Sequence, residues 1–223
     1  MRIILIVAPL VALAAYFVLL LRRNQLTFSD LWDMLSNRQE YKTSGQGGER
    51  FLYRELIRLG VPESQIFRNV YIPVHNKTNK TTEIDLLVLS KKGILVFEHK
   101  TYQGKIYGDG RSKKWAQYYH GKHTFLSPVE QNRYHAECLR RFLDVKLPIY
   151  TFITHSVSGE WHIRNIPPEA HFITKKGDFS QICQNIPDSP AMARAFHSLS
   201  EKLSPLSRPE DGTREQHIAN FGK

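Results

Sequence analysis

The chain has 223 residues, of which 31 are Lys or Arg and 21 are Asp or Glu, so its formal net charge is +10. This length suffices for one ordinary domain with appendages, and the basic surplus suits a polyanion such as nucleic acid or an anionic membrane face. Only two cysteines, Cys138 and Cys183, are present, which excludes a disulfide framework. The sequence has no Walker-type glycine loop, no G-x-G-x-x-G and no Cys/His cluster of zinc spacing.

The first element is an uninterrupted apolar segment from Ile3 to Leu21. Its 19 residues come close to the roughly 20 that a helix needs to cross a bilayer. Pro9 lies inside it, and membrane helices tolerate proline better than soluble helices do. We expect one transmembrane helix over residues 3–21. A cleavable signal peptide is the alternative, because Ala12-Leu13-Ala14 resembles a cleavage site, but the apolar run continues beyond it.

Positive charge beside this segment predicts its orientation. Arg22 and Arg23 follow the segment directly, whereas only Arg2 and the amino terminus precede it. Because positively charged flanks stay in the cytoplasm, we expect a single-pass protein of the inner cell membrane whose C-terminal domain is cytoplasmic. Residues 22–42 would form a juxtamembrane linker or a short amphipathic helix at the membrane surface.

A helix is predicted from about Gln46 to Leu59, because Glu49 and three leucines fall on one helical face. Gly60 ends this helix. Glu49 therefore lies at the N-terminal end of the core-facing stripe. It either complements the helix dipole in the first turn or points at the sheet as a third carboxylate. Phe67 to Val74 is expected to form the first strand.

Two apolar runs follow, Ile84 to Leu89 and Ile94 to Phe97, and both are typical of strands in a buried sheet. Between them, Ser90-Lys91-Lys92-Gly93 is typical of a tight turn. Two strands joined by so short a connection pair antiparallel. The sequence therefore predicts a hairpin at the centre of the domain.

Charged residues stand at the ends of these strands. Alternation places Asp85 on the face of the leucines of its strand, and it places Glu98 and Lys100 together, with His99 on the opposite face. Such groups are costly to bury unless they are paired or bind a metal. Asp85 and Glu98 could hold a hard divalent cation, and Lys100 could orient a water or offset charge on a phosphate. Surface salt bridges at strand ends are the alternative.

The next segment combines aromatic and cationic residues. Lys105 to Tyr107 predicts a short strand, and after Trp115 the residues 116–125 interleave tyrosines, histidines and lysine. Rings stack on bases and cations meet phosphates, so this composition suits contact with nucleic acid. A solvated hairpin with packed tyrosines is the alternative.

A second helix is predicted from Pro128 to Leu143. Ser127 is the expected N-cap, with Pro128 at the first position and Glu130 completing a capping box. Gln131 lies near the helix start and is expected to point at the sheet. The remaining predicted elements are two strands and then two helices: Leu147 to Thr154, His171 to Thr174, Asp178 to Ile186 and Pro190 to Leu203. From Ser204 onward the polar composition predicts a disordered tail.

In their order and spacing these motifs resemble the nuclease-related domain (NERD) family, which is similar to the PD-(D/E)xK nuclease superfamily. The residues that carry the resemblance lie between about Gly45 and Phe142: Glu49, Glu83-Ile84-Asp85, Gly93, Glu98-His99-Lys100, Gly104, Trp115 and Pro128-x-x-Gln131. The resemblance implies an α/β fold with a restriction-endonuclease-like core, in which helices flank a central mixed β-sheet. His99 is a departure, since superfamily members usually carry an apolar residue there.

The same resemblance implies roles for the site residues. Asp85 and Glu98 correspond to the metal-binding acids, Lys100 to the catalytic lysine, Glu49 to the acidic residue of the first helix and Gln131 to the glutamine of the later helix. Glu49 would bind the metal directly or through an intervening ligand. The implied metal is Mg²⁺, with Mn²⁺ as the alternative ion, and the implied partner is DNA.

Together these inferences predict four parts of the chain: a transmembrane helix at 3–21, a juxtamembrane linker at 22–42, the nuclease-like domain at 43–186, and a C-terminal helix with a disordered tail at 187–223. We expect a membrane-anchored, metal-dependent phosphodiesterase that hydrolyses DNA. The alternative is a non-catalytic, membrane-tethered module that binds nucleic acid or a protein. The presence of all three residues, Asp85, Glu98 and Lys100, favours the enzyme, because a site that has lost its catalytic activity has no need to retain all three.

Overall fold

The computed structural model describes residues 45–75, 80–155, 159–173 and 178–207. The predicted transmembrane segment, the juxtamembrane linker and the end of the tail lie outside these ranges. Within them, no helix has the length and apolar character needed to span a bilayer. All the described residues belong to the C-terminal unit, Lys42–Lys223.

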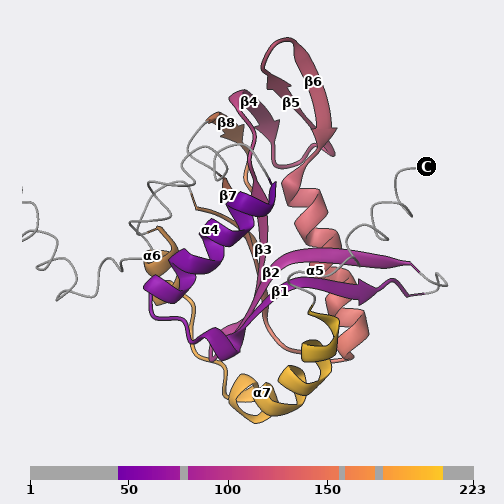
Figure 1. Cartoon of the computed structure of the whole chain (residues 1–223), viewed down its shortest axis with the longest axis vertical. Helices are drawn as coiled ribbons and strands as arrows, with labels where there is room; N and C mark the ends of the chain where they lie inside the picture. The colour runs from indigo at the N-terminus through magenta and orange to yellow at the C-terminus, as the bar shows by residue number, and fades with distance from the viewer. Residues whose placement is uncertain (1–44, 76–79, 156–158, 174–177, 208–223) are drawn as a thin grey trace, which may run out of the picture. The chain divides into compact units, whose positions relative to one another are not determined.

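A five-stranded mixed sheet forms the centre of this unit (Figure 1). The strand order is β1-β2-β3-β7-β9; β1, β2 and β3 pair antiparallel, whereas β3, β7 and β9 pair parallel. The bounds of the strands are Ile66–Pro73 (β1), Thr81–Ser90 (β2), Gly93–Lys100 (β3), Ile149–His155 (β7) and Ala170–Ile173 (β9). The predicted hairpin is confirmed, because Ser90 pairs with Gly93 across a two-residue turn.

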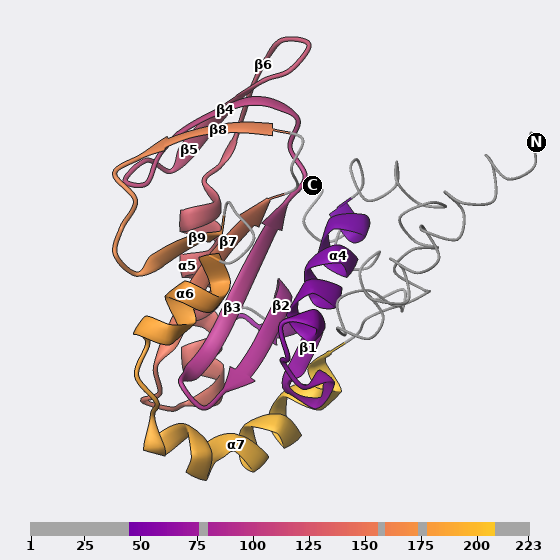
Figure 2. The same ribbon diagram turned by 90° about the vertical axis from the view of Figure 1, so that its left-hand side faces the viewer.

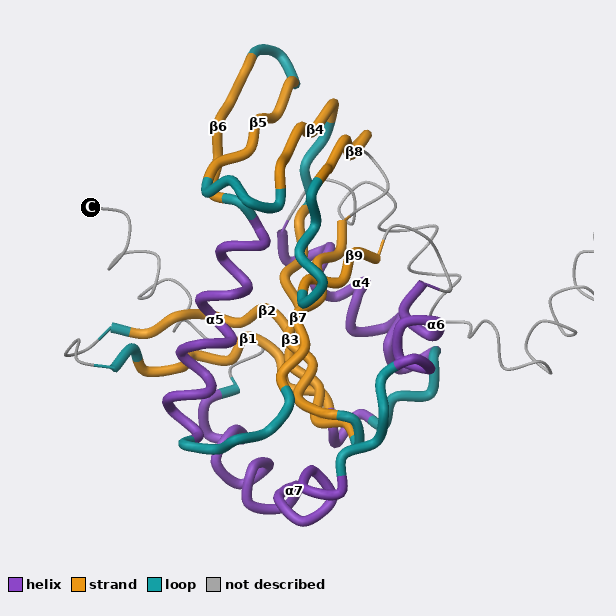
Figure 3. The backbone as a smooth tube through the Cα atoms, turned by 180° about the vertical axis from the view of Figure 1, so that it is seen from behind, coloured by secondary structure: helices purple, strands orange, loops and turns teal. Residues whose placement is uncertain are grey.

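Helices cover both faces of this sheet. Helix α4 (Gly45–Arg58) and helix α6 (Asp178–Asn185) pack on one face, and helix α5 (Pro128–Leu143) and helix α7 (Pro190–Leu203) pack on the other. Figure 3 looks onto α5, which lies against β3 and β7. The fold is therefore a mixed α/β domain whose central sheet is flanked by helices, as the sequence predicts.

Side-chain alternation along β3 divides the core between these two faces. Ile94 and Val96 belong to the cluster with α5 and α7, whereas Leu95 and Phe97 belong to the cluster with Leu52 of α4. The four β3 side chains are at most 2% exposed. Burial on both faces explains why this stretch is continuously apolar, and it leaves the charged residues for the end of the strand.

A second, four-stranded sheet follows the central strands and has the order β6-β5-β4-β8. Its strands are Gly104–Asp109 (β4), Lys114–Tyr118 (β5), Lys122–Leu126 (β6) and Gly159–Arg164 (β8). Figure 2 shows this sheet beyond the end of β3 that carries Lys100. Its inner side packs Ile106 and Trp115 against Val129 of α5. Gly108 lies directly on the Trp115 ring, where a Cβ would collide with the indole.

The start of α5 differs from the sequence prediction in one detail. Ser127 occupies the N-cap position and Pro128 is in the first turn, as predicted, but Ser127 makes no capping hydrogen bond through its side chain. Glu130 instead binds the Arg133 guanidinium at 2.8 Å. The capping-box prediction is therefore wrong, because a neighbouring arginine one turn ahead takes the carboxylate that would have closed the box.

The C-terminal segment is ordered beyond the predicted last helix. Residues Ser204–Leu206 form a 3₁₀ turn, and the Ser207 hydroxyl donates to the Arg68 carbonyl oxygen at 2.7 Å and accepts from the Arg68 amide at 3.1 Å. Ser207 thereby fastens this segment to β1, although the composition from Ser204 onward predicts disorder. The rest of the tail, from residue 208, lies outside the described ranges.

Candidate active site

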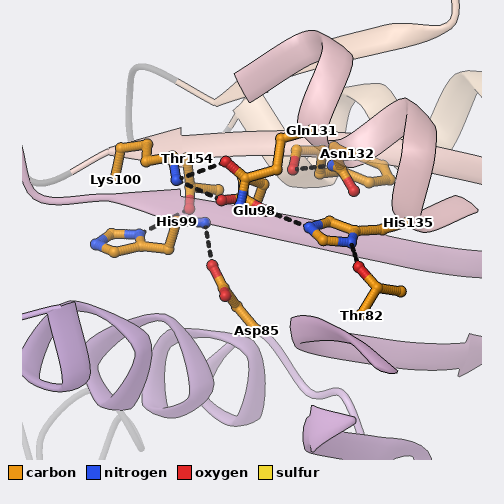
Figure 4. A network of polar contacts seen from close by, with 10 residues as sticks. Thr82, Asp85, Glu98, His99, Lys100, Gln131, Asn132, His135 and Thr154 are labelled. Atoms are coloured by element: carbon orange, nitrogen blue, oxygen red, sulfur yellow. Dashed lines mark hydrogen bonds and ion pairs between the residues drawn. The ribbon is translucent and has the colours of Figure 1, made fainter. Parts of the chain in front are cut away.

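Polar side chains from β3 and α5 meet at the carboxyl end of β3. The Lys100 ammonium lies 2.6 Å from Glu98 Oε1 and donates a hydrogen bond to Gln131 Oε1 at 3.0 Å. Figure 4 shows these three side chains together, with Gln131 reaching down from the first turn of α5. Glu98 is only 1% exposed. Three of the five predicted site residues are therefore in direct contact around a buried carboxylate.

Asp85 approaches the same strand from β2. The β2–β3 pairing begins at Leu86, so Asp85 lies just beyond the last paired residue. Opposite it on β1 is Asn69, whose φ of 47° lies in the left-handed region. Freed from the ladder, Asp85 accepts a hydrogen bond from the His99 backbone N–H to Oδ2 at 2.8 Å (Figure 4).

Three carboxylates interact at this position. Burial raises the pKa of Asp85 well above its ordinary value, and the charges of Glu98 and Glu49 raise that pKa further. The Lys100 ammonium and the hydrogen bond from His99 oppose the rise without cancelling it. Glu49 is itself buried, at 7% exposure on α4. The structure thus brings Glu49 to the sheet side of its helix and makes the cluster a place where a cation is electrostatically favoured.

Glu98 and Lys100 behave differently from Asp85. Burial alone would raise the pKa of Glu98, but Lys100 and His135 outweigh it and hold that pKa below its ordinary value. Burial likewise opposes the charge of Lys100, but Glu98 and Asp85 hold its pKa above the ordinary value. At neutral pH, Glu98 is therefore ionised and Lys100 is a cation.

A histidine that sequence reasoning did not assign to the site stands behind Glu98. His135 Nε2 lies 3.3 Å from Glu98 Oε2, and His135 Nδ1 shares a 2.7 Å hydrogen bond with the Thr82 hydroxyl (Figure 4). His135 follows Gln131 by four residues, so both point from α5 to the sheet. That spacing is the signal that could have indicated it. The partner, Thr82, could not be found from the sequence, because it lies 53 residues away along the chain.

A second unassigned residue fixes α5 to the sheet. Asn132 is fully buried, and its amide donates to the carbonyl oxygens of Val96 at 3.1 Å and Phe152 at 2.9 Å. These two residues belong to the neighbouring strands β3 and β7. Asn132 therefore sets the distance between the sheet and the helix turn that carries Gln131.

His99 points away from the carboxylate cluster, as alternation predicts. Its Nδ1 shares a 2.8 Å hydrogen bond with the Thr154 hydroxyl, and Gly48 of α4 packs so closely on the ring that a Cβ there would collide with it. Burial, followed by the neighbouring His155, lowers the pKa of His99 to about 4. The neutral ring is thus a packing element between β3 and α4.

The donor set fits a hard divalent cation by charge and atom type. Carboxylate oxygens are the ligands that Mg²⁺ prefers, and Glu98 Oε2 is a buried oxygen that faces His135 Nε2 at 3.3 Å. Over the described ranges, however, no group of three or more His, Cys, Asp or Glu side chains is already arranged to hold a metal ion. Internal partners explain this, because Lys100 occupies Glu98 Oε1 and the His99 amide occupies Asp85 Oδ2.

The fold and the site together define a mixed α/β domain of nuclease-related type. The nuclease-related domain (NERD) family matches residues 44–166, which is more than half of the chain, and the chain belongs to this family. An uncharacterized protein of Bacillus anthracis is 32% identical over 108 residues, covering 48% of this chain and 50% of that protein. The chain thus matches about half the length of this curated relative. No solved structure matches the chain.

Proposed function

We propose that the protein hydrolyses phosphodiester bonds of DNA with the help of a divalent metal ion, using a restriction-endonuclease-like core. The observation that carries this proposal is the partly buried Lys100 ammonium, which lies between Glu98 and Gln131 and within electrostatic range of Asp85. A cluster of carboxylates with a fixed cation at its edge suits a reaction in which a phosphate must be bound and its negative charge offset.

The carboxylates have the first role in this proposal. Asp85 and Glu98, supported by Glu49, would hold Mg²⁺ or Mn²⁺. A bound ion polarises the phosphate and lowers the pKa of a water. Burial, and then like-charge repulsion, raise the pKa of Asp85. The repulsion is relieved when a cation enters, so the cluster favours metal uptake.

Lys100 has the second role, and its charge state limits what that role is. Since neighbouring carboxylates hold its pKa above the ordinary value, Lys100 has no free lone pair at neutral pH and does not act as a general base. It instead places a positive charge where the phosphate becomes more negative. Gln131 positions this ammonium by accepting its hydrogen bond.

The choice of a nucleic acid as substrate rests on charge. The chain has a net charge of +10 and a sequence pI near 9.6. A polyanion gains from this surplus, because Lys and Arg side chains displace the counterions around its phosphates. The cluster of Asp85, Glu98 and Glu49 is acidic, whereas the chain as a whole is basic. This charge distribution is expected of a protein that binds a metal ion through carboxylates and the phosphates of its substrate through basic side chains.

The test is a plasmid-nicking assay on the purified full chain with Mg²⁺, with Mn²⁺ and with EDTA. We expect cleavage that depends on the metal and that falls by about 10²–10³-fold in Lys100→Met, the loss typical of removing one group that stabilises transition-state charge. Lys146→Met removes an exposed lysine from the loop after α5 and is the control. Cleavage in EDTA, or full activity in Lys100→Met, would contradict the proposal. Salt-dependent DNA binding without any cleavage would favour the non-catalytic binding module.

We further propose that residues 3–21 anchor the protein in the inner membrane, with the C-terminal domain in the cytoplasm. The support is the apolar segment itself and the arginines at positions 22 and 23. Membrane fractions washed with alkaline carbonate should retain the full chain, and protease should digest the domain only in inside-out vesicles. Release by carbonate, or digestion from the periplasmic side, would contradict this topology.

A further inference from the structure

One face of the second sheet is turned to solvent and combines aromatic rings with lysines. The exposed side chains that strand register places on this outer face include Lys105, Tyr107, Lys114, Tyr118, Lys122 and His162, together with the acidic Glu160. Alternate residues point inward, and among them Ile106 and Trp115 are 0% and 2% exposed. Trp115 itself is thus a core residue, so any contact with nucleic acid falls to its neighbours on the other side of the sheet.

The rings on the outer face form an exposed cluster. Tyr107 stacks on His162 with ring centroids 4.8 Å apart and planes inclined by 15°, and it meets Tyr118 edge-on at 5.5 Å. Tyr107 and Tyr118 nevertheless remain 44% and 45% exposed. Aromatic rings that are ordered by one another but still open to solvent provide a platform on which flat rings of a ligand can stack.

The charge around these rings selects the ligand. Residues 104–126 include five Lys or Arg and a single Asp. Lys105 is 4.0 Å from Glu160, but over the described ranges neither Lys114 nor Lys122 has a carboxylate within 4.0 Å. Lys122 Nζ lies 5.9 Å from the Tyr118 ring centroid. An anionic ligand with flat rings satisfies both features, and nucleic acid has both.

We propose that the outer face of the second sheet binds single-stranded nucleic acid, with bases stacked on Tyr107 and Tyr118 and phosphates held by Lys114 and Lys122. Bases within a duplex are already stacked on each other and do not present their faces, so the exposed rings specify a single strand. This proposal deepens the proposed function and rests on it for the choice of nucleic acid as ligand.

The chain connects this surface to the candidate active site at two points. Strand β4 begins four residues after Lys100, and α5, which carries Gln131, begins at Pro128, shortly after β6. The inner side of the same sheet packs against Val129 of α5. A nucleic-acid strand bound on the outer face is therefore held by a sheet that is connected to the candidate active site through the chain and through packing. The second sheet can thus select which nucleic acid reaches the active site.

The test measures binding without cleavage. Fluorescence anisotropy of a labelled oligo(dT) of about 20 nucleotides, a length that spans several bases of such a platform, is followed with the full chain in EDTA. We expect Tyr107→Ala and Tyr118→Ala each to weaken binding by at least about fivefold, the low end for loss of one stacked base. Tyr134→Ala is the matched control, because Tyr134 is 44% exposed but lies on α5. Thermal melting verifies that each variant is folded.

A second measurement tests the lysines. Replacing Lys114 or Lys122 by Gln should reduce the slope of log K against log salt by about 0.7 for each phosphate that is no longer neutralised, whereas Lys146→Gln should leave it unchanged. Equal binding of wild type, Tyr107→Ala and Tyr118→Ala would overturn the proposal, and so would tighter binding of a duplex of the same length. Oligonucleotide binding by a protein that cleaves no DNA under any divalent ion would sink the proposed function alone.

Discussion

Replacing Asp85 by Asn tests the electrostatics of the site without changing its shape. The amide oxygen of the new side chain can still accept the hydrogen bond from the His99 backbone N–H, so the 2.8 Å interaction is retained. What disappears is the negative charge of a carboxylate whose pKa is raised by burial and by Glu98 and Glu49. In the absence of metal we expect the variant to be more stable than the wild type at neutral pH.

The magnitude follows from the cost of a charge that is buried and repelled by its neighbours. Relieving such a penalty is worth on the order of 1–3 kcal/mol, and in a protein of this size each kcal/mol changes the melting temperature by about 2–4 °C. Lys100 and the His99 amide already offset part of the repulsion. The lower half of that range, a few degrees, is therefore the expected gain.

The pH dependence has a defined sign. Because the folded-state pKa of Asp85 lies above its unfolded value, the folded wild type binds more protons between the two values, and its stability falls as pH rises through that window. Asp85→Asn lacks this decline. The two proteins should therefore melt together near pH 4, about the ordinary pKa of an Asp, and the advantage of the variant should grow toward neutral pH.

The assay is thermal melting in EDTA over this pH range, followed by circular dichroism. Glu169→Gln is the control, since Glu169 is exposed in the turn before β9 and its replacement should leave the melting temperature unchanged. If the wild type is more stable than Asp85→Asn at neutral pH without metal, the charge of Asp85 does not destabilise the fold, and Asp85 is a satisfied structural carboxylate.

Two further substitutions test the scaffold that positions the site. Asn132→Leu removes both amide hydrogen bonds from α5 to β3 and β7, and it should destabilise the domain by about 1–3 kcal/mol in urea denaturation. Arg133→Leu, at the exposed next position, should have little effect. Equal losses of stability in the two variants would contradict the role of Asn132 in fixing α5 to the sheet. Gly48→Ala places a Cβ on the imidazole of His99, which Thr154 holds in place, and overpacking of this kind costs about 1–3 kcal/mol; an unchanged unfolding midpoint would show that His99 moves aside.

The sequence predicts the central hairpin and the first two helices of the domain because local patterns dominate there. Continuous apolar runs on either side of a short turn specify β2 and β3, and a proline after Ser127 specifies the start of α5. Alternation along β3 also separates Glu98 and Lys100 from His99, and the structure places the three side chains accordingly. Such inferences succeed because each depends on neighbours within a few residues.

Features that depend on distant parts of the chain are not predictable in this way. Strand β8 is only six residues long and pairs parallel with β4, which precedes it by some fifty residues, so its pairing partner cannot be found from neighbouring residues. The same holds for His135, whose place behind Glu98 becomes visible only when α5 is packed on the sheet. The capping-box prediction is wrong because of a local contact instead of a distant one, since Arg133 competes for Glu130 within the same helix.

A metal site at Asp85 and Glu98 is tested most directly by calorimetric titration of Mg²⁺ and of Mn²⁺ into the full chain, beside Asp85→Asn and Glu98→Gln. We expect saturable binding by the wild type and its loss in both variants, because the carboxylates of Asp85 and Glu98 supply the oxygen donors and the negative charge. Binding that is equal in all three proteins would place the metal elsewhere. Absence of binding by the wild type, even with uncleavable DNA present, would show that the cluster of Asp85, Glu98 and Glu49 is not a metal site.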